Sequence, residues 1–297
     1  MKRTALHTII KGDSIMRKKV VAIHDISCMG RCSLTVALPI LSAAGIETRI
    51  IPTAILSTHT AGFENYTFRD LTDDIEPIVR HWKTLNVHND GIYTGYLGSE
   101  RQLDIISHVF DELCTEQTLI AVDPVMADNG SLYPAFSADF PAGMARLVAK
   151  AHVAIPNITE ACLLLGMPYQ ELGYTEHYIR ELLTGMAALG PDKVVITGVQ
   201  YDASTIGAAS FDRETNTFSY VSTPKVDGYF HGTGDVFSSG LVAGLINGMD
   251  LARAAQTAIH LTYNSILATL ETDFEARYGV DFEQILPAFI DELAQKP

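Results

Sequence analysis

The stretch FHGTGDVFSSG, residues 230–240, is the most informative segment of the 297-residue chain. Its glycines, Gly232 and Gly234, allow a tight turn and a close approach of the backbone to a ligand. The residues that follow predict a helix whose first N–H groups point toward a phosphoryl group or a developing oxyanion. Asp235 would lie in its first turn, where a carboxylate can accept a proton from a hydroxyl. On this motif alone, a glycine turn with an Asp favoured by the helix dipole explains the pattern equally well.

A second segment, VDPVMADNG at residues 122–130, places two carboxylates after an apolar run. Pro124 excludes a helix there and fixes the turn. Asp123 and Asp128 would suit Mg²⁺, which binds one or two carboxylates together with waters and phosphate oxygens. Taken alone, an Asp-rich loop whose side chains cap the backbone accounts for the segment about as well.

A third segment, PNITE at residues 156–160, has Asn157 at the end of a predicted strand and Glu160 in the first turn of the next helix. An Asn followed three residues later by Glu is a capping-box pattern. For Glu160 by itself, we therefore favour a helix cap. The chain contains no G-x-x-x-x-G-K-[ST] motif, which excludes a P-loop nucleotide site.

Short β-branched runs alternate with helical patterns along the chain. This alternation predicts an α/β fold with a mostly parallel central sheet and helices on both faces. Two adjacent β runs, at 206–211 and 218–221, predict a small antiparallel hairpin at one edge of the sheet. In such sheets ligands bind beyond the C-terminal ends of the strands. Polar segments fall at those ends, namely 25–27, 57–62, 94–99, 123–129, 157–160 and 197–198.

The remaining strands are expected at residues 20–23, 48–52, 91–94, 119–122, 153–155 and 194–197. Helices are expected at 33–44, 71–85, 100–113, 140–149, from 160 to at least 165, at 176–189, from 233 onward, at 251–270 and at 282–293. We interpret residues 54–68 as an irregular loop. Because there is neither a linker nor a repeat, we expect one domain at 19–297, preceded by a flexible extension at 1–18.

Composition narrows the class of protein. The chain is 47% hydrophobic, enough for a sizeable core, and its net charge of −14 disfavours nucleic acid as a partner. No apolar run reaches transmembrane length, so we expect no membrane partner and a cytoplasmic location. Cys28 and Cys32 lack the further ligands that a zinc site needs. A structural or redox role for this pair is the minor alternative to four free thiols in a reducing cytosol.

Together the segments at 123–126 (D-P-V-M), 156–160 (P-N-x-x-E) and 232–235 (G-T-G-D) resemble the ribokinase-like kinases. The resemblance spans residues 19 to about 270. Each piece is unspecific, but their order is highly specific for this superfamily. The resemblance implies an ATP-dependent kinase in which Asp235 is the base. It also implies that the backbone of Gly232, Thr233 and Gly234 forms an anion hole.

Within that superfamily the chain is most similar to the pyridoxal (vitamin B6) kinases. The segment TGYLGS at 94–99 resembles theirs, as do STHT at 57–60 and KVD at 225–227. This similarity implies transfer of the ATP γ-phosphate to the 5′-hydroxymethyl group of pyridoxal, pyridoxine or pyridoxamine, as in vitamin B6 salvage. It implies Mg²⁺ and a homodimer, and it leaves a requirement for K⁺ open.

The same similarity implies a set of site residues. Thr60 and Tyr96 would line the pyridine pocket, although Tyr96 as a half-buried core residue and Thr60 as a loop cap are the plainer alternatives. Asp128 and Glu160 would meet the metal ions. The nucleotide would contact Asp123, Asn157, Thr197, Lys225, Val226 and Thr233. We assign no chemical role to the histidines next to these segments, which are His24, His59 and His231.

The sequence departs from the family pattern at Asp25, where many pyridoxal kinases have Ser. Hydroxymethylpyrimidine kinases of thiamine synthesis carry an Asp at the comparable place, so a pyrimidine alcohol is the alternative substrate. An Asp would also pair with the protonated ring nitrogen of a B6 vitamer. The plainer explanation is that Asp25 caps the following turn. A catalytically silent B6- or nucleotide-binding protein is a further alternative, although a binder does not need the base at Asp235.

Overall fold

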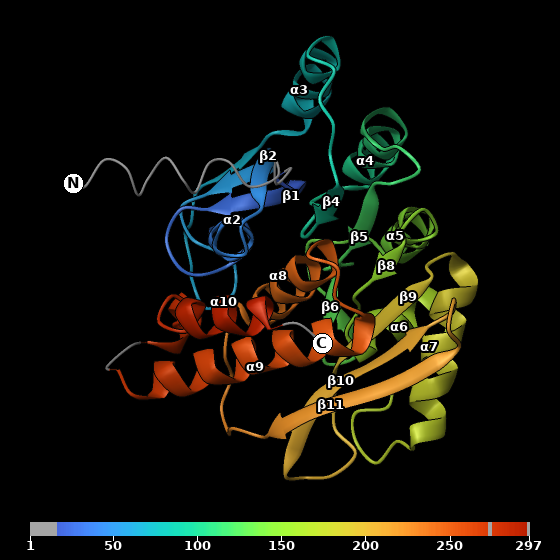
Figure 1. Cartoon of the computed structure of the whole chain (residues 1–297), viewed down its shortest axis with the longest axis vertical. Helices are drawn as coiled ribbons and strands as arrows, with labels where there is room; N and C mark the ends of the chain where they lie inside the picture. Colours follow the sequence, from blue (N-terminus) through green and yellow to red (C-terminus); the bar gives the residue numbers. More distant parts are fainter. Residues whose placement is uncertain (1–16, 273–274, 296–297) are drawn as a thin grey trace, which may run out of the picture.

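The computed structural model describes residues 17–272 and 275–295 (Figure 1). The flexible extension expected at 1–18 therefore lies almost entirely outside the described residues. A nine-stranded sheet forms the centre of the molecule, in the order β11-β10-β9-β8-β5-β4-β1-β2-β3. Its strands are β1 (Lys19–Ser27), β2 (Glu47–Leu56), β3 (Phe68–Asp70), β4 (Gly91–Thr94), β5 (Leu119–Val122), β8 (Val153–Ala154), β9 (Lys193–Val199), β10 (Thr205–Asp212) and β11 (Thr217–Pro224).

The six central strands, from β2 to β9, pair in parallel, as the alternating pattern predicts. At one edge, β10 pairs antiparallel with both β9 and β11, which confirms the predicted hairpin. At the other edge, the short strand β3 pairs antiparallel with β2. The apolar strands are buried on both faces because helices cover both sides of the sheet.

The helices divide between the two faces, and each group buries its own hydrophobic cluster against the sheet (Figure 1). One face carries α2 (Leu34–Ala43), α8 (Thr233–Ile246), α9 (Leu251–Leu270) and α10 (Leu286–Ala294). The other carries α3 (Thr72–Thr84), α4 (Glu100–Leu113), α5 (Phe140–Val148), α6 (Ile158–Leu165) and α7 (Glu176–Leu189). The predicted fold class is confirmed. None of the described helices is long and apolar enough to cross a membrane.

The interpretation of residues 54–68 as loop is wrong at both ends. β2 continues to Leu56 and β3 begins at Phe68, because Leu56 pairs with Phe68 and Ala54 with Asp70. This pairing connects segments twelve or more residues apart, so local composition carries no sign of it. The last helix, α10, begins at Leu286 instead of 282, with a proline in its first turn that favours a helix start.

A two-stranded hairpin was not predicted. It pairs β6 (Ala127–Asp128) with β7 (Ser131–Leu132). Its turn residues, Asn129 and Gly130, have φ of 49° and 77°. Asn-Gly with two positive φ angles is the preferred two-residue hairpin turn, so the dipeptide itself carried the signal.

Candidate active site

The site begins at the N-terminus of α8, beyond the ends of the parallel strands. Gly232 is the N-cap residue of this helix, with φ of 76°. A Cβ there would collide with the backbone carbonyl of Arg31, so only glycine fits. Gly234 follows in an exposed position with open space around its Cα. The first N–H groups of α8 have no acceptor within the helix, which makes this end suited to an anion.

Asp235 is half-buried in the first turn of α8. Its Oδ2 accepts hydrogen bonds from the Ser33 N–H at 2.8 Å and from the Cys32 thiol at 3.4 Å. Burial raises the pKa of Asp235 to about 6; the Ser33 N–H opposes this rise, and the negative charge of Asp25 adds to it. A carboxyl with a pKa just below neutral is ionised at pH 7 and still basic enough to take up a proton.

Asp25 lies where the pairing of β1 with β2 shifts register, between His24 and Ile26. Such a bulge re-aims a side chain at the end of a strand. Asp25 is only 6% exposed, and its Oδ2 accepts a hydrogen bond from the Ser27 hydroxyl at 3.2 Å. Burial is the main cause of its raised pKa. The side chains of Ser33 and Ser27 and the backbone of Asp25 act against this rise in the pKa. A buried carboxylate that its neighbours compensate only in part is a strong partner for a cationic ligand group.

The two other predicted substrate residues differ in their surroundings. Tyr96 is half-buried and stacks at an angle on Phe136, with ring centroids 5.6 Å apart. Burial, followed by the negative charge of Asp25, raises the pKa of its hydroxyl, so Tyr96 and Asp25 lie in the same region. Thr60 is exposed in the segment between β2 and β3. The structure thus brings Asp25 and Tyr96 together and leaves Thr60 at the surface.

Asp123 follows β5 and faces α8. Its Oδ2 accepts a hydrogen bond from the Ser238 hydroxyl at 2.7 Å, and both side chains are buried. Burial raises the pKa of Asp123 to about 8; the Ser238 hydroxyl lowers it, and the charge of Asp235 raises it further. Sequence reasoning missed Ser238, although its spacing of three residues from Asp235 places both on one face of α8.

Glu160 and Asn157 form the predicted capping box at the start of α6. The Asn157 N–H donates to Glu160 Oε2 at 2.8 Å, and the Glu160 N–H donates to Asn157 Oδ1 at 2.9 Å. Glu160 Oε1 also accepts the Met126 N–H at 3.1 Å, and Asn157 Nδ2 donates to the Ala127 carbonyl at 2.8 Å. Both side chains therefore hold the backbone that leads into the β6–β7 hairpin.

Burial and then the charge of Asp123 raise the pKa of Glu160, against the backbone N–H groups that lower it. Asp128 is half-buried and accepts hydrogen bonds only from Asn129 among the described residues. Within the described ranges, no cluster of three or more His, Cys, Asp or Glu side chains could hold a metal ion by itself. A metal here would thus need phosphate oxygens and waters as further ligands.

The other residues predicted to meet the nucleotide come from three parts of the chain: β9, the end of β11 and the start of α8. Thr197, in β9, forms an isolated parallel bridge with Asn157. The Lys225 side chain is exposed and Val226 is half-buried after β11. The Thr233 hydroxyl donates to the Phe230 carbonyl at 3.1 Å. Their contact with a nucleotide stays a prediction.

His24 and His59 are buried, and neither ring nitrogen of His24 has a hydrogen-bond partner among the described residues. Complete burial lowers the pKa of His24 to about 3, so this imidazole is neutral and packs edge-on against Tyr93. His59 bonds to the Arg277 carbonyl through Nε2 at 2.5 Å. All four cysteines are free thiols, and Cys28 does not pair with Cys32.

Several known proteins resemble this chain in sequence and in overall fold. The family model of phosphomethylpyrimidine kinase matches residues 42–279. The pyridoxal kinase of Dictyostelium discoideum is 28% identical, over 86% of this chain and 87% of its own. The crystal structure of the pyridoxal kinase of Lactobacillus plantarum is 32% identical, with a TM-score of 0.85 over 93% of this chain and 97% of its own.

A further crystal structure comes from Bacteroides thetaiotaomicron, a protein provisionally named a phosphomethylpyrimidine kinase. It is 37% identical, with a TM-score of 0.89 over 93% of this chain and 94% of its own. Its orthorhombic form, with a TM-score of 0.87, contains pyridoxal.

The sheet order, the glycine turn at the start of α8 and these similarities define a kinase of the ribokinase-like superfamily. Within that superfamily, the chain belongs to the family of the phosphomethylpyrimidine and pyridoxal kinases. The match to the family model begins after Asp25, so it does not bear on the residue at which the sequence departs from the pyridoxal kinase pattern.

The capping box at α6 generates a first prediction. Glu160→Ala should lower the free energy of unfolding by about 2–4 kcal/mol, because two buried N–H groups, those of Met126 and Asn157, would lose their acceptor. Asp128→Ala, which removes a carboxylate from the neighbouring β6–β7 hairpin, should cost less than about 1 kcal/mol. Urea unfolding of both variants measures this. Equal stability of the two variants would contradict a capping role for Glu160.

Proposed function

We propose that this chain transfers the γ-phosphoryl group of ATP to the 5′-hydroxymethyl group of a B6 vitamer: pyridoxal, pyridoxine or pyridoxamine. One observation carries the proposal: Asp235, with its raised pKa, lies at the open N-terminus of α8 and interacts electrostatically with the buried Asp25. In this arrangement Asp235 is suited to act as a base beside an anion site. Asp25 is suited to bind a cationic ring. The similarity to a Bacteroides protein crystallised with pyridoxal favours the same substrate class.

The reaction needs a base and stabilisation of the transferred group. The substrate hydroxyl oxygen attacks the γ-phosphorus, its O–P bond forms, and the bond to the β-phosphate oxygen breaks to release ADP. Asp235 accepts the hydroxyl proton. The N–H groups of Gly232, Thr233 and Gly234 lie at the end of α8 that favours negative charge, so they would stabilise the charge on the transferred group.

Substrate recognition follows from the chemistry of the ring. A B6 vitamer has a basic pyridine nitrogen and an acidic phenolic hydroxyl on the same ring, so its zwitterion presents an N–H⁺ group. Asp25, buried and with few neighbouring donors, would pair with this group more strongly than a serine hydroxyl could. Tyr96 would cover one face of the ring, and Thr60 would contact it from the exposed loop.

Nucleotide and metal binding are assigned by the same reasoning. Asp123, Asn157, Thr197, Lys225, Val226 and Thr233 would surround ATP. Mg²⁺ would neutralise phosphate charge, and Asp128 is the carboxylate better suited to it, because Glu160 already accepts backbone N–H groups at both oxygens. Glu160 would then act by holding the hairpin that carries Asp128. A homodimer and a requirement for K⁺ stay predictions.

A second candidate substrate is the aminopyrimidine alcohol of thiamine synthesis. The observation that favours it is Asp25 itself, since kinases for that alcohol carry an Asp at the comparable place. A catalytically silent binding protein is disfavoured, because the donors at Asp235 and its raised pKa serve proton transfer and bring nothing to binding alone.

The proposed function is tested by ATP turnover over a panel of alcohols. We expect the purified protein to phosphorylate at least one B6 vitamer with a kcat/KM at least tenfold above that for hydroxymethylpyrimidine, which is a discrimination of about 1.4 kcal/mol. Product identification by mass spectrometry of the 5′-phosphate provides the measurement. Preference for the pyrimidine would establish the second candidate, and no turnover of any alcohol would establish a silent binder.

Asp235 supplies a further prediction. Asp235→Asn should lower kcat by roughly 10²–10⁴-fold and leave ATP affinity nearly unchanged, because it removes the base and keeps the shape. In the wild type, activity should fall as pH drops through about 6, since protonation of the raised Asp235 carboxyl removes the base. A pH profile of kcat/KM measures this midpoint. Near-normal kcat in the variant would refute the role.

Asp25 is tested by Asp25→Asn, which keeps the shape and removes the charge. Loss of a charged hydrogen bond should raise KM for the B6 vitamers roughly ten- to a hundredfold, with little change for ATP. Steady-state kinetics with each substrate varied in turn separates the two effects. Normal vitamer binding combined with a lower melting temperature would show that Asp25 only caps the turn.

A further inference from the structure

Two hydrogen-bond donors converge on a single oxygen of Asp235. The Ser33 N–H and the Cys32 thiol both donate to Oδ2, at 2.8 and 3.4 Å. Among the residues that the structure describes, none donates to Oδ1. The carboxyl group therefore has one oxygen fixed by the protein and one that remains available, which defines its orientation toward a ligand.

Ser33, which supplies the shorter of these bonds, has a strained backbone. Its φ of 58° and ψ of −126° lie where L residues are rarely found. It is 3% exposed and is the N-cap residue of α2, yet its side chain caps no N–H group of the helix. Strain of this kind costs about 1–3 kcal/mol and persists only where the surroundings enforce it. In this strained conformation the Ser33 N–H points at Asp235, while the Ser33 side chain does not cap α2.

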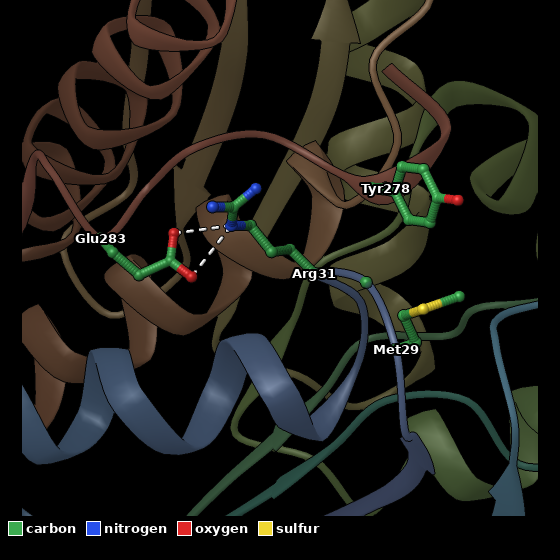
Figure 2. Close-up of a pocket in the computed structure, with 5 residues that line it drawn as sticks. Met29, Arg31, Tyr278 and Glu283 are labelled. Carbon is green, nitrogen blue, oxygen red and sulfur yellow. Dashed lines mark hydrogen bonds and ion pairs between the residues drawn. The ribbon is translucent and has the colours of Figure 1, made fainter. Parts of the chain in front are cut away.

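The C-terminal segment enforces this geometry through Arg31. The Arg31 N–H donates to the Tyr278 carbonyl at 2.7 Å. The Arg31 carbonyl lies against the Cα atoms of Gly232 and Gly279, where a Cβ on either glycine would collide with it. Figure 2 shows the Arg31 side chain extended toward Glu283, whose carboxylate accepts from Nε at 2.7 and 2.9 Å. Arg31 is thus held through its backbone and its side chain at once.

We propose that the segment Arg31–Ser33, held by residues 278–283, positions the base of this site, with the Cys32 thiol as a donor that orients the Asp235 carboxylate. The inference rests on the proposed function, in which Oδ1 receives the substrate proton. Cys32 is a positioning residue, because it acts on the substrate only through Asp235. The segment differs from a passive loop in that both of its donors serve the same carboxylate oxygen.

The groups around Asp235 determine whether removal of the Cys32 thiol raises or lowers the pKa of this carboxyl. The negative charge of Asp25, in β1, disfavours the ionised form of Asp235. The carboxyl of Asp123, which follows β5, and the neutral phenol of Tyr93, in β4, also lie close enough to interact with Asp235. Only the Ser33 N–H and Cys32 oppose this trend through hydrogen bonds to the charged form. Removing the thiol should therefore raise the pKa of Asp235 and move the acid limb of activity to higher pH.

The test compares Cys32→Ala with Cys32→Ser, and uses Cys28→Ala as a matched control on an exposed cysteine. For Cys32→Ala we expect the acid limb of kcat/KM to shift up by roughly half to one pH unit. At pH values well below the midpoint of the acid limb, this shift corresponds to a three- to tenfold loss of kcat/KM. At pH 8 kcat/KM should be nearly normal. Cys32→Ser should restore most of the wild-type midpoint, because its hydroxyl can donate in place of the thiol. Cys28→Ala should follow the wild type throughout.

A second measurement keeps the inference testable without turnover. The ¹³C carboxyl resonance of Asp235 in the ligand-free protein, assigned by its absence in Asp235→Asn, should titrate higher in Cys32→Ala by the same interval. An unchanged midpoint in a folded Cys32→Ala protein, or equal shifts in Cys32→Ala and Cys32→Ser, would overturn the inference. A wild type that phosphorylates no alcohol would refute the proposed function, while the resonance would still decide whether Cys32 acidifies Asp235.

Discussion

The burial of three carboxyl groups in one region is the constraint on which this site depends. Asp25, Asp123 and Asp235 lose water where the parallel strands end. In addition, the charge of Asp25 raises the pKa of Asp235, and the charge of Asp235 raises that of Asp123. A buried carboxyl is tolerated only with donors at hand. Each has at least one donor. The Ser27 hydroxyl donates to Asp25, the Ser238 hydroxyl donates to Asp123, and the N–H of the strained Ser33 together with the Cys32 thiol donates to Asp235. The raised pKa values that remain after this compensation are what make proton transfer near neutral pH feasible.

Sequence reasoning succeeded where the signal is local. The glycine turn before α8, the Asn157–Glu160 capping box and the alternation of strands with helices each follow from neighbouring residues. It failed where the decisive contact is distant. The β3 strand exists only because it pairs with β2, and the bulge at Asp25 only because β1 pairs with β2 out of register. Ser33 carried no sign of a positive φ, because the C-terminal segment that imposes it lies about 245 residues further along the chain.

The two glycines against the Arg31 carbonyl illustrate why close backbone packing is hard to infer from composition. Gly232 belongs to a recognisable motif, and its turn alone explains its presence. Gly279 belongs to no motif, yet it meets the same carbonyl from the other side. The Arg31 carbonyl oxygen leaves no room for a Cβ atom at either position, so the N-terminus of α8 and the C-terminal segment pack against the same backbone group. The C-terminal residues thus contribute to the backbone packing of the site.

Helix α8 joins the two halves of the site into one rigid unit. Asp235 would act on the alcohol, whereas Ser238, one turn further, donates a hydrogen bond to Asp123, which is proposed to meet the nucleotide. Because both side chains project from the same helix face, the base and the nucleotide contact keep a fixed separation. Any adjustment to substrates of different size must therefore come from the exposed parts, namely the segment around Thr60 and the β6–β7 hairpin that carries Asp128. With the base fixed on a rigid helix and the binding segments exposed, the site could bind related alcohols without a change in the position of the base.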